Sequence, residues 1–161
     1  MRRNARWLLL AAALVAADQF TKWLVRRALP LGGSVALTPF FNLVHAENSG
    51  AAFSFLAQQA GWQRWLFTAL GLGAAALIAT LLRRPRRALF GAGLGCVLGG
   101  ALGNVLDRLL RGRVTDFIDL YVVHAGRQWH WPAFNLADSA ITIGAILLLL
   151  DEWLQSRRER R

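Results

Sequence analysis

Cysteine is nearly absent from this sequence, which has one among 161 residues. With Cys96 alone, an intramolecular disulfide and a cysteine-based metal site are both excluded. Cys96 lies inside an apolar run, which is typical of a small packing residue. The three histidines, His45, His124 and His130, match no zinc-ligand spacing, so we predict no metal site. No serine-nucleophile motif and no phosphate-cradling loop occurs either.

Acidic residues are also scarce: Asp and Glu number 9 against 19 Lys and Arg, and the net charge is +10. Such a basic balance suits either nucleic acid or a membrane surface. The arginines form short clusters beside apolar runs, whereas a nucleic-acid binder would more often spread them over a soluble face. We therefore expect a membrane protein that binds no nucleic acid, and the length predicts a single domain over 1–161.

Long apolar runs are what the sequence has in abundance, and a helix needs about 20 mostly apolar residues to cross a bilayer. Two runs carry no charge, and the last one carries only Asp138. The first run is interrupted by Asp18 and Lys22. Its basic start and small residues also fit a secretory signal peptide, but its apolar character resumes after Asp18, which favours a retained helix. We predict an all-α membrane protein with four transmembrane helices at about 7–25, 65–82, 88–107 and 133–153.

Arginine clusters set the expected orientation of these helices. An even number of crossings puts all three clusters on one side, which the positive-inside rule makes cytoplasmic, together with both termini. The loops at about 26–64 and 107–131 then lie outside, where we expect a small β-rich and amphipathic region. Residues 35–43 favour a short strand, and 53–65 an amphipathic surface segment. The clusters are Arg2, Arg3 and Arg6; Arg83, Arg84, Arg86 and Arg87; and Arg157, Arg158, Arg160 and Arg161.

Glycines follow one another at four-residue spacing along the third helix, at positions 91, 95, 99 and 103. This spacing places a flat stripe on one helix face and predicts close approach of a neighbouring helix.

Acidic groups at membrane depth are costly, so each needs an explanation. Asp18, Asp107, Asp116 and Asp138 all map near the outer ends of predicted helices. Two aspartates held close together share one proton near neutral pH, which suits acid–base hydrolysis of an amide. The residues alone do not select the pair, because Asp138 at a helix start serves equally well as a cap. We expect Asp119, which lies on the outer loop, to be solvated.

Two further charged pairs have simpler interpretations. Asp18 and Lys22 lie four apart on one helix face and predict a structural ion pair. Asp107 and Arg108 predict a charge network in which Arg108 neutralises nearby carboxylates. Three functions stay open at this point: a protease, a small transporter or proton-conducting bundle, and a non-catalytic assembly factor that uses the glycine stripe as an interface.

Five blocks of residues, in order from the first helix to the last, resemble the bacterial lipoprotein signal peptidase (signal peptidase II) family. One block alone would be weak, whereas five in order on a four-crossing layout are specific. The blocks are Asp18-Gln19-Phe20-Thr21-Lys22; Asn48-Ser49-Gly50-Ala51-Ala52-Phe53; Gly103-Asn104-Val105-Leu106-Asp107-Arg108; Val114-Thr115-Asp116-Phe117; and Phe134-Asn135-Leu136-Ala137-Asp138.

The resemblance implies an aspartic endopeptidase of the bacterial inner membrane whose catalytic dyad is Asp116 and Asp138. It implies a substrate as well: a prolipoprotein whose cysteine carries diacylglycerol, cut just before that cysteine near the outer leaflet. Apolar surface between the helices would hold lipid chains, no metal or organic cofactor is required, and we expect a monomer. The residues that the resemblance or the local sequence marks as supporting or substrate-binding are Asp18, Lys22, Asn48, Gly50, Asn104, Asp107, Arg108 and Asn135.

Overall fold

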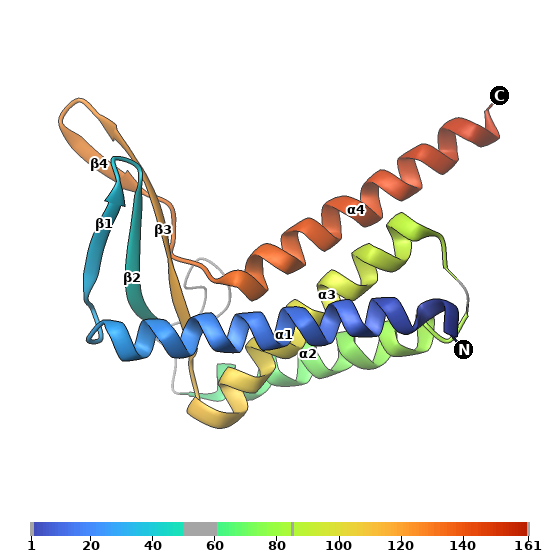
Figure 1. Ribbon diagram of the computed structural model, residues 1–161, viewed down its shortest axis with the longest axis horizontal. Helices are drawn as coiled ribbons and strands as arrows, with labels where there is room; N and C mark the ends of the chain where they lie inside the picture. Colours follow the sequence, from blue (N-terminus) through green and yellow to red (C-terminus); the bar gives the residue numbers. More distant parts are fainter. Residues whose placement is uncertain (1, 50–60, 85, 161) are drawn as a thin grey trace.

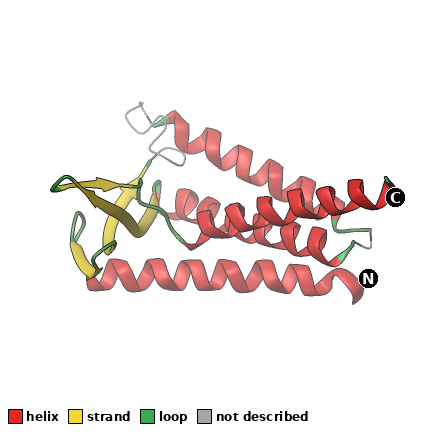
Figure 2. Cartoon of the chain, turned by 90° about the horizontal axis from the view of Figure 1, so that it is seen from above, coloured by secondary structure: helices red, strands yellow, loops and turns green. Residues whose placement is uncertain are grey.

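A computed structural model describes residues 2–49, 61–84 and 86–160, and it consists of long helices with a small antiparallel sheet at one end. Both chain termini lie at the opposite end of the helices, as Figure 1 and Figure 2 show. The elements are α1 (Arg2–Ala28), β1 (Ser34–Thr38), β2 (Phe41–Asn48), α2 (Trp62–Leu81), α3 (Ala88–Arg111), β3 (Val114–His124), β4 (Arg127–His130) and α4 (Leu136–Glu159).

Helix α3 is the centre of the bundle and packs against α1, α2 and α4. The predicted glycine stripe is confirmed as its contact with α1. A Cβ atom at Gly95 would lie 2.9 Å from the carbonyl oxygen of Trp7, and one at Gly99 would lie 2.9 Å from that of Ala11. These distances are shorter than a carbon and a backbone oxygen tolerate, so only glycine lets α1 approach this closely.

A second glycine face on α3, which the four-residue spacing did not reveal, receives α4. A Cβ atom at Gly93 would lie 2.9 Å from the carbonyl oxygen of Gly144, and one at Gly100 would collide with that of Ala137. The two faces together place the backbones of α1 and α4 directly against α3. Short side chains on the three helices can therefore meet one another.

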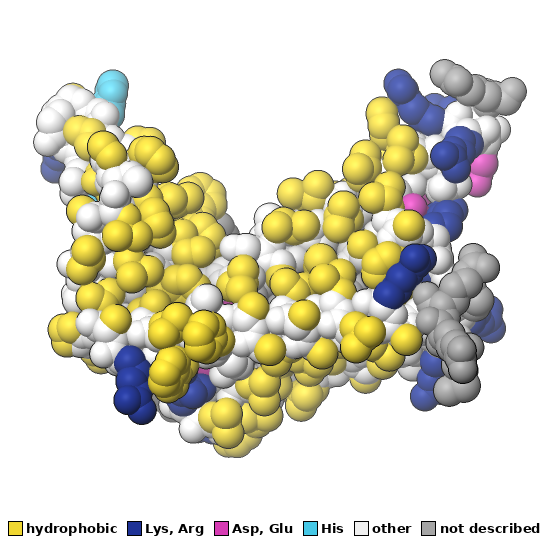
Figure 3. Space-filling model, in the orientation of Figure 1, with side chains coloured by type: hydrophobic (Ala, Val, Ile, Leu, Met, Phe, Trp, Pro, Cys, Tyr) yellow, Lys and Arg dark blue, Asp and Glu magenta, His cyan; other side chains and the backbone are white. Residues whose placement is uncertain are grey.

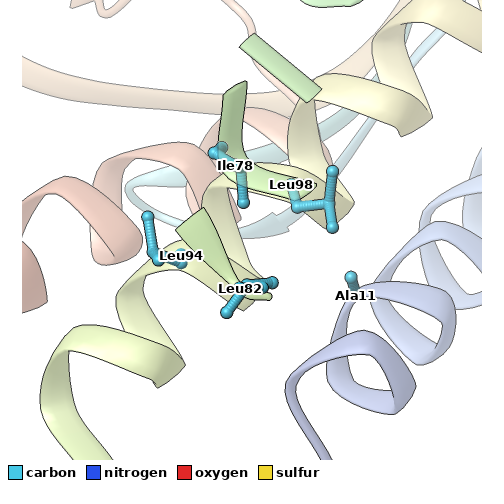
Figure 4. Close-up of a cluster of buried hydrophobic side chains, with 5 residues drawn as sticks. All are labelled: Ala11, Ile78, Leu82, Leu94 and Leu98. Atoms are coloured by element: carbon cyan, nitrogen blue, oxygen red, sulfur yellow. The ribbon is translucent and has the colours of Figure 1, made fainter. Parts of the chain in front are cut away.

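Buried apolar side chains fill the half of the bundle away from the sheet. Ala11, Ile78, Leu82, Leu94 and Leu98 come from α1, the C-terminal end of α2 and α3, and they form one cluster (Figure 4). Outside this core, large apolar side chains cover the helices, as Figure 3 shows. An apolar surface of this extent is unusual for a protein in water and suits a lipid environment.

Three helical segments are long and apolar enough to cross a membrane: Asn4–Ala28, Trp62–Leu81 and Ala88–Arg111. Helix α4 is not among them. It has 24 residues, but Asp138, Asp151 and Glu152 lie along it, and Arg157 and Arg158 lie in its last turn. These charges lower its average hydropathy. The fourth crossing therefore stays a prediction.

The sheet has the strand order β1-β2-β3-β4, with every neighbouring pair antiparallel. The expected strand within 35–43 is present as β1 and the start of β2. The second half of the sheet, β3 and β4, comes from the segment 107–131, for which we expected a β-rich outer region but predicted no individual strands. Ala125 and Gly126 have positive φ angles of 51° and 73° and turn the chain between these two strands.

The amphipathic surface segment predicted for residues 53–65 falls largely on positions 50–60, which lie outside the described residues. From Trp62 onward the chain belongs to α2.

Candidate active site

Lys22 of α1 lies at the junction of the helices and the sheet, and its ammonium group is fully buried. Its Nζ atom lies 2.8 Å from Asp18 and 2.9 Å from Asp107 of α3, and both carboxylates are almost completely buried. The ion pair predicted from the four-residue spacing of Asp18 and Lys22 is therefore confirmed. Burying these charges is tolerable because Lys22 and Arg111, whose Nη1 lies 2.9 Å from Asp107, together balance the two carboxylates, and all are hydrogen-bonded.

Asp18 and Asp107 also form hydrogen bonds to the two elements that carry Asp138 and Asp116. Oδ1 of Asp18 accepts a 2.9 Å hydrogen bond from the backbone N–H of Ala137 in the first turn of α4. Negative charge is favourable there because the first N–H groups of a helix point at it. Oδ2 of Asp107 accepts a 3.3 Å hydrogen bond from the backbone N–H of Thr115, the residue before Asp116. The Lys22 cluster thus fixes where β3 and α4 begin.

The charge network expected around Asp107 and Arg108 is present, since the Arg108 guanidinium interacts electrostatically with the carboxylates of Asp138, Asp116 and Asp107. Asp107 forms its ion pairs with Lys22 and with Arg111, whose Nη1 lies 2.9 Å away. Arg111 lies one helical turn after Asp107 on the same face, whereas Arg108 is its chain neighbour and points elsewhere. The Arg108 guanidinium lies 5.3 Å from the centre of the Phe67 ring and lines a pocket beside Asp116 and Asp138.

Asp116 lies in β3, and its side chain is almost fully buried. Oδ1 accepts a 2.7 Å hydrogen bond from Nδ2 of Asn135, and Oδ2 a 3.1 Å hydrogen bond from Nδ2 of Asn48. Burial, and then the charge of the nearby Asp138, raise the pKa of Asp116 to about 7. The two asparagine donors and the charge of Lys22 act in the opposite direction and are outweighed.

Asp138 lies in the first turn of α4 and forms a capping box with Asn135, the N-cap residue. Oδ1 of Asn135 accepts from the N–H of Asp138 at 2.9 Å, and Oδ2 of Asp138 accepts from the N–H of Asn135 at 3.2 Å. The capping role considered for Asp138 is therefore real. It engages one oxygen, while Oδ1 accepts a 2.8 Å hydrogen bond from Nδ2 of Asn104. Capping and catalysis do not exclude each other here.

Two asparagine side chains connect the two aspartates. Oδ1 of Asn104 accepts from Lys22 at 3.0 Å and from Asn135 at 3.2 Å, so its amide nitrogen is turned toward Asp138. Asn135 in turn donates to Asp116. Because an ammonium only donates and an ionised carboxylate only accepts, these charges fix the orientation of both amides. The result is a continuous path from Lys22 to both carboxylates.

A pocket of about 390 Å³ opens beside Asp116 and Asp138, between β3, α4 and the segment that joins β4 to α4. Figure 3 shows the surface hollowed between the sheet and α4. Its polar lining consists of the two aspartates, Asn48, Asn104, Arg108, Ser139 and Thr142, and its apolar lining of Val114, Trp131, Pro132, Ala133, Phe134 and Ile143. A pocket with apolar walls and a few convergent polar groups is the usual form of a binding site.

Most of the residues expected at the site are brought together here, by direct contact or as pocket lining: Asp18, Lys22, Asn48, Asn104, Asp107, Arg108, Asp116, Asn135 and Asp138. Gly50 lies outside the described residues. Sequence reasoning missed Gln19, whose Nε2 donates to Asp107 at 3.3 Å and to the carbonyl of Gly103 at 3.1 Å. Its position beside Asp18 in the first block was the available signal.

The expectation that Asp119 is solvated is wrong. Its side chain is largely buried and accepts hydrogen bonds from Asn42 and His130, because β2 and β4 pair with β3 on either side of it. In the described ranges 2–49, 61–84 and 86–160, no group of three or more His, Cys, Asp or Glu side chains could hold a metal ion.

The family described as Signal peptidase (SPase) II matches residues 10–154 of the chain. Proteins named lipoprotein signal peptidase, from Paraburkholderia phymatum and Burkholderia mallei, are 54% and 53% identical over 157 residues, which cover 97% of this chain and 92% of each relative. Two solved structures, each described as a bacterial membrane enzyme, align with TM-scores of 0.82 and 0.76 at 28% and 29% identity. They cover 98% and 91% of this chain, and 92% of each solved chain.

Replacing Lys22 with methionine tests whether the buried ammonium holds the site together. We expect Lys22→Met to lower the free energy of unfolding by about 3–5 kcal/mol, because it leaves the buried Asp18 and Asp107 carboxylates without their shared cation. Unfolding in detergent micelles measures this loss. The control is Arg27→Met, which removes an exposed cation from the same helix and should cost less than about 1 kcal/mol. Equal losses in the two variants would contradict the role of Lys22.

Proposed function

The chain belongs to the signal peptidase II family, membrane enzymes that cleave the signal peptides of lipoproteins, and we propose that it works as an aspartic endopeptidase through Asp116 and Asp138. Three functions were open from the acidic residues alone: a protease, a transporter and an assembly factor. Membership in this family selects the protease. The observation that carries the proposal is the shared pocket: two carboxylates from different elements, one on β3 and one on α4, line the same apolar cavity.

The electrostatics of the pair support acid–base hydrolysis. A pKa of about 7 for Asp116 lets the pair gain or lose a proton near neutral pH, as acid–base catalysis by two carboxyl groups requires. The proton belongs to the pair and not to one residue alone. The ionised carboxylate takes a proton from water as the water oxygen adds to the peptide carbonyl carbon, and the protonated carboxyl donates to the carbonyl oxygen. Proton transfer to the amide nitrogen then releases an amine and a carboxylic acid.

The substrate that we propose is a prolipoprotein whose cysteine carries diacylglycerol, cut just before that cysteine. The pocket supports this proposal because its apolar walls adjoin the lipid-suited helix surface, so an acyl-anchored cysteine can reach the carboxylates from the membrane. Asn48 and Arg108 line the pocket and are the candidates for hydrogen bonds to the peptide backbone of the substrate. Membrane lipids surround the helices, and we propose that the enzyme works as a monomer.

We further propose that α4 is a fourth crossing and that both termini are cytoplasmic in the bacterial inner membrane. A helix of 24 residues is about 36 Å long, which exceeds the roughly 30 Å of a bilayer core. The Asp151 side chain is buried and lies 2.6 Å from Arg87, so its charge is compensated away from lipid. Many Lys and Arg side chains gather at the helix ends away from the sheet (Figure 3), as the positive-inside rule predicts for a cytoplasmic face.

Removing either carboxyl charge tests the dyad. We expect Asp116→Asn and Asp138→Asn each to reduce kcat for a lipidated precursor by roughly 100- to 10,000-fold, because neither asparagine can exchange a proton with water or substrate. Cleavage by purified enzyme in detergent gives the rates, and circular dichroism checks that the variants fold. The matched control is Asp151→Asn, a buried aspartate at the far end of the same helix, which should cleave within a few-fold of the wild type. Normal turnover by Asp116→Asn or Asp138→Asn would end the proposal.

The pH dependence of cleavage tests the shared proton. Above a pH of about 7 the pair loses its last proton, so kcat should fall along an alkaline limb. Asn48 donates to Oδ2 of Asp116, which stabilises the ionised form and lowers its pKa. Asn48→Leu removes this donor and keeps the branching at Cγ, so the pKa should rise and the alkaline limb should move to higher pH. A limb that stays in place or moves to lower pH in Asn48→Leu would contradict the assignment of the proton.

The lipid requirement has its own test. Two precursors of the same sequence, one carrying diacylglycerol on its cysteine and one unmodified, are cleaved side by side at equal concentrations. We expect kcat/KM to be at least about tenfold lower without the lipid, because acyl chains contribute about 0.8 kcal/mol per buried CH₂ to binding. Equal values would refute the lipid specificity while leaving the dyad intact.

A further inference from the structure

The Asp119 carboxylate joins three strands of the sheet at one point. Nδ1 of His130 lies 2.8 Å from Oδ1 and 2.9 Å from Oδ2, and Nδ2 of Asn42 donates to Oδ2 at 2.8 Å. Asn42 is in β2, directly opposite Asp119 in the register of β2 and β3. His130 is in β4, opposite Tyr121, and its ring stacks on the Tyr121 ring with 5.1 Å between centres. An ionised carboxylate can only accept, so Nδ1 of His130 carries the proton and donates it.

His130 is the last residue of β4, and the chain goes from it directly into the wall of the catalytic pocket. Residues 131–134, which follow it, all line this pocket. The backbone N–H of Trp131 donates to the carbonyl of Leu120 at 2.7 Å, so the wall begins where the strand pairing ends. Neither Asp119 nor His130 is among the described residues that line the pocket. Residues 131–134 therefore form the direct backbone connection from His130 to the pocket.

The other end of the wall is anchored separately. The N–H of Phe134 donates to the carbonyl of Ile118 at 3.0 Å, and the carbonyl of Phe134 accepts from the N–H groups of Phe117 and Ile118. The next residue, Asn135, carries the hydrogen bond to Asp116 and caps α4. These bonds hold the start of α4 and the two catalytic carboxylates without help from His130. Loosening the His130 end should therefore move the wall and leave the dyad in place.

We propose that the Asp119–His130 pair is a positioning element that sets the Trp131–Phe134 wall for substrate binding. The pair acts on the affinity for the precursor and not on the chemical step. The inference rests on the proposed function, because it takes the pocket of Asp116 and Asp138 as the site of cleavage.

The test compares KM and kcat for a diacylated precursor in single and double variants. We expect His130→Ala and Asp119→Ala each to raise KM by roughly tenfold, with kcat within about twofold of the wild type, because a displaced wall weakens positioning of the peptide. The double variant should be no worse than either single one, because the two residues act as a unit. His130→Asn should restore a KM close to that of the wild type, because its Nδ2 donor is as many bonds from the backbone as Nδ1 of histidine.

The matched control is His124→Ala, which removes the exposed histidine at the turn of the same hairpin and should leave KM and kcat unchanged. Thermal unfolding of each variant verifies that it is folded, and Asp119→Ala carries the test if His130→Ala is not. A fall in kcat with constant KM, an equal effect in His124→Ala, or no rescue by His130→Asn would overturn the inference. Asp116→Asn is assayed in parallel. If it cleaves normally, the proposed dyad is wrong; if it is inactive while His130→Ala keeps the wild-type KM, only the positioning role is wrong.

Discussion

A lysine ammonium buried between two carboxylates is the interaction on which the arrangement of this protein depends. Lys22 lies between Asp18 and Asp107 where apolar helices meet the sheet, and together with Arg111 it compensates the charge of these two buried carboxylates. The other oxygen of Asp18 accepts an N–H group from the first turn of α4, and the Asp107 oxygen that faces Lys22 also accepts the N–H of Thr115, the residue before Asp116. The elements that carry the two proposed catalytic carboxylates are therefore positioned by the same charges that make the site tolerable at membrane depth.

Close packing of the helices allows short aspartate and asparagine side chains to form the hydrogen-bonded network of the site. Aspartate and asparagine reach only a few ångströms from their backbones, so a network built from them requires backbones that nearly touch. Glycine on two faces of α3 allows this, with Gly99 against α1 and Gly100 against α4. Asn104, on the same helix, can then contact Lys22 on one side and Asp138 on the other.

The sheet supplies what a bundle of helices alone would lack, namely a second element bearing a carboxylate and one wall of the pocket. Asp116 is held in β3 by strand pairing, and the chain that leaves β4 returns along the pocket to begin α4. The segment between β4 and α4 is connected to the two aspartates by the hydrogen bonds of Phe134 to β3 and by the Asn135 cap of α4. Substrate binding and chemistry thus depend on neighbouring but separate anchors, one at His130 and one at Phe134.

The sequence by itself determined the membrane class, the apolar helices, the stripe of glycines and the short list of aspartates, because these depend on composition and on spacing along one helix. It also determined the Asp18–Lys22 pair, since four residues make one helical turn. It did not predict that Asp107 pairs with Arg111, that Asp119 is buried or that 114–130 forms a hairpin. Those depend on which strands and helices become neighbours. Only the tertiary structure decided that Asp138, a capping residue of α4, also lines a pocket with Asp116, because contacts between distant segments have no signal in local spacing.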